Sequence, residues 1–346
     1  MKLSKITLIL IISIYLIKST VSISEIPNIG IGSKDEVSKD ALMQKVYYSI
    51  RSDNKQCSTP HCGGYFIKKL NSIEGTEDSQ EIYISEMMTS NPLLNSTMIN
   101  QLKQIQQQQQ QQQLNMIIQP PFTLVVSGDI TPSHSNDGLY HCLHLTDILH
   151  VMSIPIEDLE INKKKQTIKP QEQYYFIKPS PYKCNGILTD CPAYVVMKAN
   201  THEIEFLQSY VESYTTSIPM LDQHWLNSRL VSENSDVSAM VKGYIVGEKL
   251  TISYIFLNTI DPPTKCKPPQ VKRCENLKPN QIPVFTRTID RCVVFTECIE
   301  RGPCHFGVPS CTQGYHPSVI QVAPKGCRRY YCDPDFLPII SQLQIN

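Results

Sequence analysis

Cysteine content constrains this chain more than any other feature of its sequence. Among 346 residues there are 13 cysteines, and four of them form two close pairs, Cys57 with Cys62 and Cys184 with Cys191. Eight more lie within 67 residues near the C-terminus: Cys266, Cys274, Cys292, Cys298, Cys304, Cys311, Cys327 and Cys332. In an oxidising compartment such a set predicts disulfides. Structural zinc sites usually begin with two ligands about two residues apart, and no C-x-x-C occurs, so we expect no metal site and no cofactor.

The N-terminus indicates that compartment. Lys2 and Lys5 precede an apolar run at residues 6–17, and small residues suited to cleavage follow near Ser22. A membrane-spanning helix needs about 20 apolar residues, so the run predicts a cleaved signal peptide over residues 1–22, with an uncleaved anchor as the alternative. No later stretch approaches that length. We therefore expect a secreted, extracellular protein without a membrane span.

The charge balance of the chain argues against strongly anionic partners. The chain has 32 basic and 32 acidic residues, and loss of the predicted signal peptide leaves 29 basic and 32 acidic, a net charge of −3. Such a balance gives no electrostatic reason to expect nucleic acid or an anionic membrane as a partner.

An internal repeat organises the first two thirds of the chain. Residues 47–51 (YYSIR) match residues 174–178 (YYFIK), and a cysteine follows ten residues after the first tyrosine in both copies. Asn71 and Asn200 each come nine residues after the second cysteine of their copy. Only the loop between the cysteines differs in length, so we interpret the two segments as related units.

The residue pattern of each copy predicts a β-hairpin. Aromatic and β-branched runs flank loops that contain proline or glycine, a pattern typical of two strands joined by a turn. We expect each hairpin to be stapled by its own disulfide, Cys57–Cys62 or Cys184–Cys191. A crossed pairing between the copies is the alternative.

The remaining strand-like runs extend this pattern. They lie at residues 81–85, 122–130, 139–149, 239–245 and 250–260. Gly128 and Gly243 occupy matching positions, and residues 218–232 have helical spacing. The sequence predicts a strand-rich α+β fold of pseudo-repeated, disulfide-stapled β-hairpin units over residues 45–165 and 170–262, packed as one domain or two neighbours.

The segment between the copies is expected at the surface. Residues 106–113 are all glutamine, which cannot bury enough apolar surface to form a core, so we predict a disordered loop at about residues 101–116. Asn95 begins an N-glycosylation acceptor, which suits a surface segment of a secreted chain.

The first hairpin carries a resemblance to a known family. Residues 51–71, with the core C-S-T-P-H-C-G-G-Y, resemble the signature of a secreted domain family of unknown function that occurs in bacteria and in amoebae. The resemblance covers about residues 45–262 and includes the second basic/Cys hairpin, which ends in Asn200. Family members often carry further cysteines near the position of Ile82, so we expect the disulfide pattern here to differ. The family has no established activity, so the resemblance implies no catalytic residue.

A cysteine-rich module is expected at residues 264–337. Six prolines between Pro262 and Pro283 predict a semi-rigid arm, which we expect few contacts to cross. The eight cysteines that follow predict a small, mostly β or irregular module that depends on its disulfides, and 105 pairings are open to it. Its end, around Cys311 and Cys332, resembles the closing half of a von Willebrand factor type C module, with Gly326 at the place of one family cysteine. That resemblance implies an extracellular interaction module.

Cys142 is left over when the other twelve cysteines are paired. It lies in a strand-like run between His141 and His144, and strand alternation puts Cys142 and His144 on one face. We interpret it as a buried free thiol. An intermolecular disulfide, or a Cys–His nucleophile or metal site, is the alternative.

No catalytic constellation emerges from the sequence. There is no G-x-S-x-G elbow, H-E-x-x-H pair, P-loop or dinucleotide-binding turn, and Phe206 stands where the second histidine after His202-Glu203 would be. We therefore name no catalytic residue and favour an extracellular binding, adhesion or matrix-interaction protein, whose partner is an extracellular protein or glycan. The alternatives are a secreted hydrolase with an unrecognised site and a protease inhibitor that uses residues 299–303 as bait. Arg328, Arg329, Tyr330 and Tyr331 form the candidate contact patch.

Overall fold

The computed structural model describes residues 45–53, 62–89, 91–92, 94, 124–135, 138–154, 170–182, 191–234, 236–262, 266–269, 274, 280–304, 307 and 309–339. The predicted signal peptide, the glutamine run, Asn95, Cys57 and Cys184 lie outside these residues. All described residues belong to one compact unit, Ser38–Asn346. Strands predominate among them, which confirms the strand-rich prediction. No described helix is long and apolar enough to cross a membrane.

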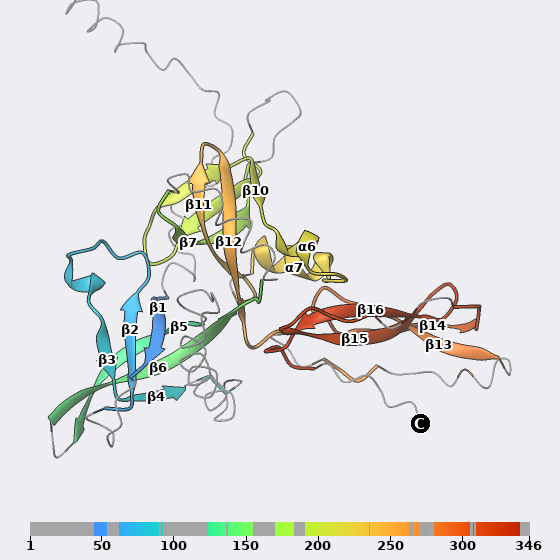
Figure 1. The fold of residues 1–346 in the computed structure, drawn as a ribbon, viewed down its shortest axis with the longest axis horizontal. Helices are drawn as coiled ribbons and strands as arrows, with labels where there is room; N and C mark the ends of the chain where they lie inside the picture. The colour runs from blue at the N-terminus through green and yellow to red at the C-terminus, as the bar shows by residue number, and fades with distance from the viewer. Residues whose placement is uncertain are drawn as a thin grey trace, which may run out of the picture. The chain divides into compact units, whose positions relative to one another are not determined.

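The first half of the chain forms six strands of a 12-stranded sheet (Figure 1). They are β1 (Tyr47–Ser52), β2 (Tyr65–Lys69), β3 (Ile82–Ile84), β4 (Glu86–Thr89), β5 (Leu124–Ser135) and β6 (Gly138–Val151), with a 3-10 turn at Glu77–Ser79. β2 pairs with β1 and β3, and β5 pairs with β1 and β6, all antiparallel. β4 runs parallel to β6.

The second half forms six further strands, which pair in the same order. They are β7 (Gln173–Pro179), β8 (Tyr194–Lys198), β9 (Ile204–Leu207), β10 (Ser209–Val211), β11 (Met240–Val246) and β12 (Lys249–Asn258). β8 pairs with β7 and β9, β11 pairs with β7 and β12, and β10 runs parallel to β12. The two halves join where β6 pairs antiparallel with β12 around His150 and Leu257.

Gly128 and Gly243 lie at corresponding irregularities of the sheet. The register shifts at Gly128 in the β5–β6 pair and at Gly243 in the β11–β12 pair. A Cβ atom at Gly128 would overlap the carbonyl oxygen of His144, and one at Gly243 would overlap that of Thr251. Both bulges therefore need glycine, because the neighbouring backbone approaches too closely for a side chain.

Asn71 ties the end of β2 to β7. Its backbone has φ 55°, a left-handed conformation that asparagine tolerates better than most residues. Its Nδ2 donates to the carbonyl oxygens of Tyr174 (2.8 Å) and Ala199 (2.9 Å), while its Oδ1 accepts from the amide of Tyr174 (2.9 Å). One side chain thus satisfies three backbone groups of the second half.

Asn200 makes the reciprocal contacts with the first half. Its φ is 61°, its Nδ2 donates to the carbonyl oxygens of Tyr47 (2.7 Å) and Leu70 (3.0 Å), and its Oδ1 accepts from the amide of Tyr47 (2.8 Å). The Tyr47 and Phe176 rings also lie 5.2 Å apart. β1 and β7 are interior strands of the sheet order β3-β2-β1-β5-β6-β12-β11-β7-β8-β9, so these contacts cross-link two strands that four others separate along that order.

Two helices cover part of the second half. They are α6 (Tyr214–Ser217) and α7 (Gln223–Leu230), and the second lies within the predicted helical segment. Asp222 caps α7 by accepting a hydrogen bond from the amide of Trp225 (3.1 Å). Trp225, Leu226 and Leu230 are fully buried, so α7 anchors the larger hydrophobic cluster of the molecule. A second cluster fills the first half, around Ile67, Leu143 and Ile148 among others.

The C-terminal module (residues 264–337) consists of two hairpins. They are β13 (Gln281–Arg287) with β14 (Val293–Glu300), and β15 (Tyr315–Val322) with β16 (Cys327–Pro334). Disulfides Cys266–Cys292 and Cys274–Cys298 serve the first hairpin, and Cys304–Cys327 and Cys311–Cys332 serve the second. The eight cysteines therefore pair among themselves, four per hairpin.

The expectation that few contacts cross the Pro-rich arm is wrong. Tyr315, Cys332 and Leu337 of the module pack into the same cluster as Trp225. Tyr315 Oη donates to the carbonyl oxygen of Ser153 at 2.7 Å. The physical reason is that a module of two hairpins is too small to enclose a full core of its own, so Tyr315, Cys332 and Leu337 complete their burial against the cluster around Trp225.

Candidate functional site

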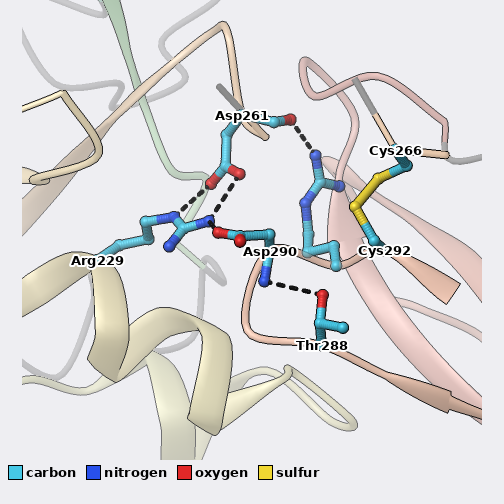
Figure 2. Close-up of a disulfide and its surroundings, with 7 residues drawn as sticks. Arg229, Asp261, Cys266, Thr288, Asp290 and Cys292 are labelled. Atoms are coloured by element: carbon cyan, nitrogen blue, oxygen red, sulfur yellow. Dashed lines mark hydrogen bonds and ion pairs between the residues drawn. A yellow bond between two sulfur atoms is a disulfide. The ribbon is translucent and has the colours of Figure 1, made fainter. Parts of the chain in front are cut away.

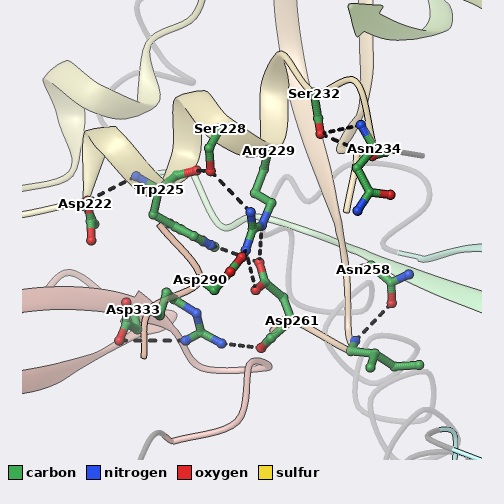
Figure 3. Close-up of polar contacts among 12 residues, drawn as sticks. Asp222, Trp225, Ser228, Arg229, Ser232, Asn234, Asn258, Asp261, Asp290 and Asp333 are labelled. Carbon is green, nitrogen blue, oxygen red and sulfur yellow. Dashed lines mark hydrogen bonds and ion pairs between the residues drawn. The ribbon is translucent and has the colours of Figure 1, made fainter. Parts of the chain in front are cut away.

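A buried ion pair between Arg229 and Asp261 lies where α7 meets the C-terminal module (Figure 3). Arg229 comes from the last turn of α7, and Asp261 follows β12. Arg229 Nε lies 2.9 Å from Asp261 Oδ2, and Nη2 lies 3.1 Å from Oδ1, a two-pronged arrangement that favours arginine over lysine. Trp225 Nε1 donates to the same carboxylate at 2.9 Å. The two charged side chains are only 3% and 4% exposed, so the pair is shielded from water.

The turn of the first module hairpin completes this pair. Asp290 Oδ1 lies 2.8 Å from Arg229 Nη2, and Arg291 Nη2 donates to the backbone carbonyl of Asp261. The Arg291 guanidinium also lies 5.5 Å from the centroid of the Trp225 ring. Cys292, which forms a disulfide with Cys266, directly follows Arg291 at this turn (Figure 2). Charged residues before the Pro-rich arm, Arg229 and Asp261, thus bind charged residues after it, Asp290 and Arg291, and hold the module in place.

The two guanidinium groups respond differently to this burial. Burial alone lowers the pKa of Arg229, but hydrogen bonds and charges from Asp261 and Asp290 outweigh it and raise the pKa above its ordinary value. Burial lowers the pKa of Arg291, and the nearby carboxylates of Asp333 and Asp261 oppose this only in part. Arg229 is therefore the better compensated of the two charges.

A second buried ion pair, Arg287 with Asp333, extends the cluster. Arg287 Nη2 lies 2.5 Å from Asp333 Oδ1, Arg287 Nε lies 3.1 Å from Asp222 Oδ2, and Ser318 Oγ lies 2.6 Å from Asp333 Oδ2. Burial alone would raise the pKa of Asp333, but the charge and hydrogen bonds of Arg287, helped by Arg291 and Ser318, lower it instead. Asp222 both caps α7 and pairs with the module, which couples the helix to β13.

These groups form one junction cluster, defined here as Asp222, Arg229, Asp261, Arg287, Asp290, Arg291 and Asp333. Three arginines face four aspartates, so the charges nearly balance. Removing Asp261 or Asp333 would take away the buried carboxylate partner of an arginine, which costs more than breaking an exposed ion pair. The cluster therefore has a structural role, because its ion pairs connect α7 and the segment after β12 to the C-terminal module. No three His, Cys, Asp or Glu side chains in the described part of the chain are grouped to hold a metal ion.

The structure describes only one cysteine of each predicted hairpin pair. Cys62 and Cys191 are disulfide-bonded, whereas their predicted partners Cys57 and Cys184 lie outside the described residues. The local staples therefore stay a prediction. Cys142 is a buried free thiol on β6, opposite Thr131 of β5.

The candidate contact patch on β16 divides into two parts. Arg328 and Arg329 are exposed, while Tyr330 and Tyr331 are half-buried. The Tyr331 ring lies between two guanidinium groups, 4.5 Å from that of Arg287 and 5.5 Å from that of Arg329. Tyr331 is therefore a support that contacts the junction cluster, and the two arginines are the exposed part.

The predicted bait segment, residues 299–303, is tied to the second hairpin. Gly302 donates its amide to the carbonyl oxygen of Lys325 at 2.9 Å, and the amide of Arg301 lies 3.4 Å from the carbonyl oxygen of Asn280. Ile299 and Glu300 belong to the end of β14.

Sequence reasoning did not find the junction cluster. Arg229, Asp261 and Asp290 are single charged residues far apart in the chain, and each resembles an ordinary surface residue. The available signal was Asp222 three residues before the lone Trp225, which is typical of a helix cap next to a buried aromatic residue.

Comparison with known proteins gives relatives without known activity. Residues 46–120 match a family described as "Domain of unknown function (DUF6748)". An uncharacterized protein of Dictyostelium discoideum is 27% identical over 300 residues, which is 86% of this chain and 89% of that protein. No solved structure matches. The chain is thus similar, over most of its length, to this Dictyostelium discoideum protein.

Proposed function

We propose that this chain is a secreted, extracellular binding protein that presents its C-terminal module to a protein or glycan partner. One observation carries the proposal: two hairpins, pinned by four disulfides, are held against the sheet by the buried junction cluster. A surface held this rigidly loses little conformational freedom on binding, so it is well suited to recognition.

The exposed face of the module supports the same proposal. Arg328 and Arg329 are exposed residues of β16, and the Arg329 guanidinium lies 5.5 Å from the centroid of the Tyr331 ring. Arginine and tyrosine are enriched in the centres of binding interfaces, where each supplies both polar and planar contacts.

The finer architecture also belongs to this proposal. We propose that residues 45–165 and 170–262 are two copies of one unit, each with a local staple, Cys57–Cys62 or Cys184–Cys191. The matching strand order and the reciprocal contacts of Asn71 and Asn200 support it. Peptide mapping of unreduced protein should recover both local linkages, and a Cys57 or Cys62 peptide joined to a Cys184 or Cys191 peptide would show crossed copies.

Secretion is testable directly. We expect secreted material to begin between about Ile23 and Ile26, because the apolar run at residues 6–17 is too short to span a membrane. N-terminal sequencing measures this. Met1 retained in a membrane fraction would refute the proposed compartment, and mass analysis of the same material would report a glycan at Asn95.

Binding is tested with the purified mature chain on an array of glycans and extracellular matrix proteins. We expect selective binding that is lost after the disulfides are reduced and alkylated, because the hairpins are then no longer held together by covalent cross-links. A panel of extracellular proteases on the same array tests the inhibitor alternative. A chain that binds none of these surfaces at ~10 μM, a concentration at which specific interfaces normally register, would overturn the proposal.

A further inference from the structure

Positive and negative charge are separated along this chain. Residues 264–346 contain 11 basic and 6 acidic residues, a net charge of +5, whereas residues 23–263 contain 18 basic and 26 acidic, a net charge of −8. The near-neutral total of the mature chain therefore hides a basic C-terminal part and an acidic remainder. Such an asymmetry bears on the partner that each part can attract.

Basic side chains in the acidic part commonly have carboxylate partners. Among the described residues of that part, the ion pairs include Lys45–Asp147, Arg51–Glu81, Lys69–Asp78, Lys198–Glu203, Lys242–Glu172 and Arg229–Asp261. In the C-terminal module, Arg287 and Arg291 are buried in the junction cluster and pair with Asp333. These cations are already compensated, so they offer little to an anionic ligand.

Four exposed cations of the module form a different group, named here the basic tip: Arg301, Lys325, Arg328 and Arg329. No carboxylate among the described residues forms an ion pair with any of these four side chains. Glu300, beside Arg301, is the nearest acidic residue in sequence. The basic tip therefore carries positive charge that the described chain leaves uncompensated.

The backbone holds the basic tip together. Gly302 donates to the carbonyl oxygen of Lys325, which places Arg301 next to the β15–β16 turn. The Cys304–Cys327 disulfide, with a Cα–Cα distance of 5.5 Å, joins the same two segments directly before Arg328. Disulfide and hydrogen bond together hold the backbone segments that carry the four cations at one end of the module.

We infer that the basic tip binds an acidic polysaccharide, a chain that carries sulfate or carboxylate groups. This inference rests on the proposed binding function and names its partner. Guanidinium groups match sulfate and carboxylate oxygens with paired hydrogen bonds, and three of the four cations are arginines. A flexible polymer needs contact with these four cations alone, whereas a flat anionic membrane, which presents charge over a wide area, would also be repelled by the net −8 of residues 23–263.

The test uses the full secreted chain and immobilised dextran sulfate, with unsulfated dextran as the neutral control. Arg328→Ser with Arg329→Ser, and separately Arg301→Ser with Lys325→Ser, should each weaken binding on the order of 30-fold at ~0.1 M salt. The matched control, Lys249→Ser with Lys267→Ser, removes the same charge from exposed positions outside the tip and should stay within about twofold.

Three results would overturn the inference. They are absence of binding to dextran sulfate, equal losses in the tip variants and the matched control, and equally tight binding of poly-glutamate or of phosphatidylserine vesicles. The intrinsic fluorescence of buried Trp225 verifies that each variant is folded. If the matrix array still finds a partner, any of these results ends the inference while the proposed function stands.

Discussion

Replacing Asp261 by asparagine tests whether the junction cluster holds the C-terminal module in place. The substitution keeps the shape of the side chain and removes one buried charge. Asp261 accepts side-chain hydrogen bonds from both Arg229 and Trp225 and is only 4% exposed. Arg229 would then keep only Asp290, which is 42% exposed, as a charged partner.

The expected cost follows from burial. Breaking a buried ion pair by removing one partner costs about 3–5 kcal/mol. Asparagine still offers one acceptor oxygen and Asp290 remains, so we expect about 3 kcal/mol for Asp261→Asn. The matched control is Asp78→Asn, which breaks the Lys69–Asp78 pair at a carboxylate that is 65% exposed. That surface pair should be worth at most about 0.5 kcal/mol.

The assay is urea unfolding under non-reducing conditions, followed by the fluorescence of Trp225. This residue is the sole tryptophan, and its ring lies inside the cluster, so it reports on the junction itself. Combining Asp261→Asn with Arg229→Met should cost less than the sum of the two single variants by at least ~1 kcal/mol, because the second change removes the charge left unpaired by the first.

The reasoning fails if Asp261→Asn costs no more than Asp78→Asn. It fails equally if the double variant is simply additive, because additive costs would mean that the two buried charges do not stabilise one another.

The remaining predictions concern the sheet and its dependence on pH. Asn71→Ala and Asn200→Ala should each cost about 2–3 kcal/mol in urea unfolding, because each amide makes three backbone hydrogen bonds; a cost below ~1 kcal/mol would contradict a cross-link between the two halves by these residues. Gly128→Ala should cost at least ~2 kcal/mol, whereas Gly307→Ala, which meets no neighbour within 4 Å, should be near neutral by thermal unfolding. Burial lowers the pKa of His150 to about 4, whereas an unfolded histidine titrates near ~6.5. The unfolded state therefore gains the proton first, so stability should fall as pH drops from ~6.5 towards 4, and His150→Gln should flatten that slope.

Local patterns in the sequence predicted much of the sheet. The aromatic and β-branched runs at residues 47–51 and 174–178 became β1 and β7, and the helical spacing at 218–232 contains α7. Gly128 and Gly243 were matched by their neighbours alone, and both lie at bulges. These features succeed because strand periodicity and close backbone approach leave a trace within a few residues.

The contacts that join distant segments could not be predicted in this way. Arg229 and Asp290 are 61 residues apart, and nothing near either one indicates the other. The pairing of Cys304 with Cys327 was one of many combinations that the spacing allowed. The same limit hid the partners of Asn71, because its neighbours in sequence match those of Asn200 but do not indicate the groups that its amide reaches.

The cross-links made by Asn71 and Asn200 have a consequence for assembly. Each asparagine satisfies backbone groups of the opposite half, so an isolated half would lose these hydrogen bonds at Tyr47 or Tyr174. Joining the halves in one chain turns a bimolecular encounter into an internal one, which raises the effective concentration of each half for the other. Two separately expressed halves, residues 38–160 and 161–346, should therefore find one another in solution, and a polypeptide with a single half of this kind would make the same asparagine contacts by pairing with a second copy of itself.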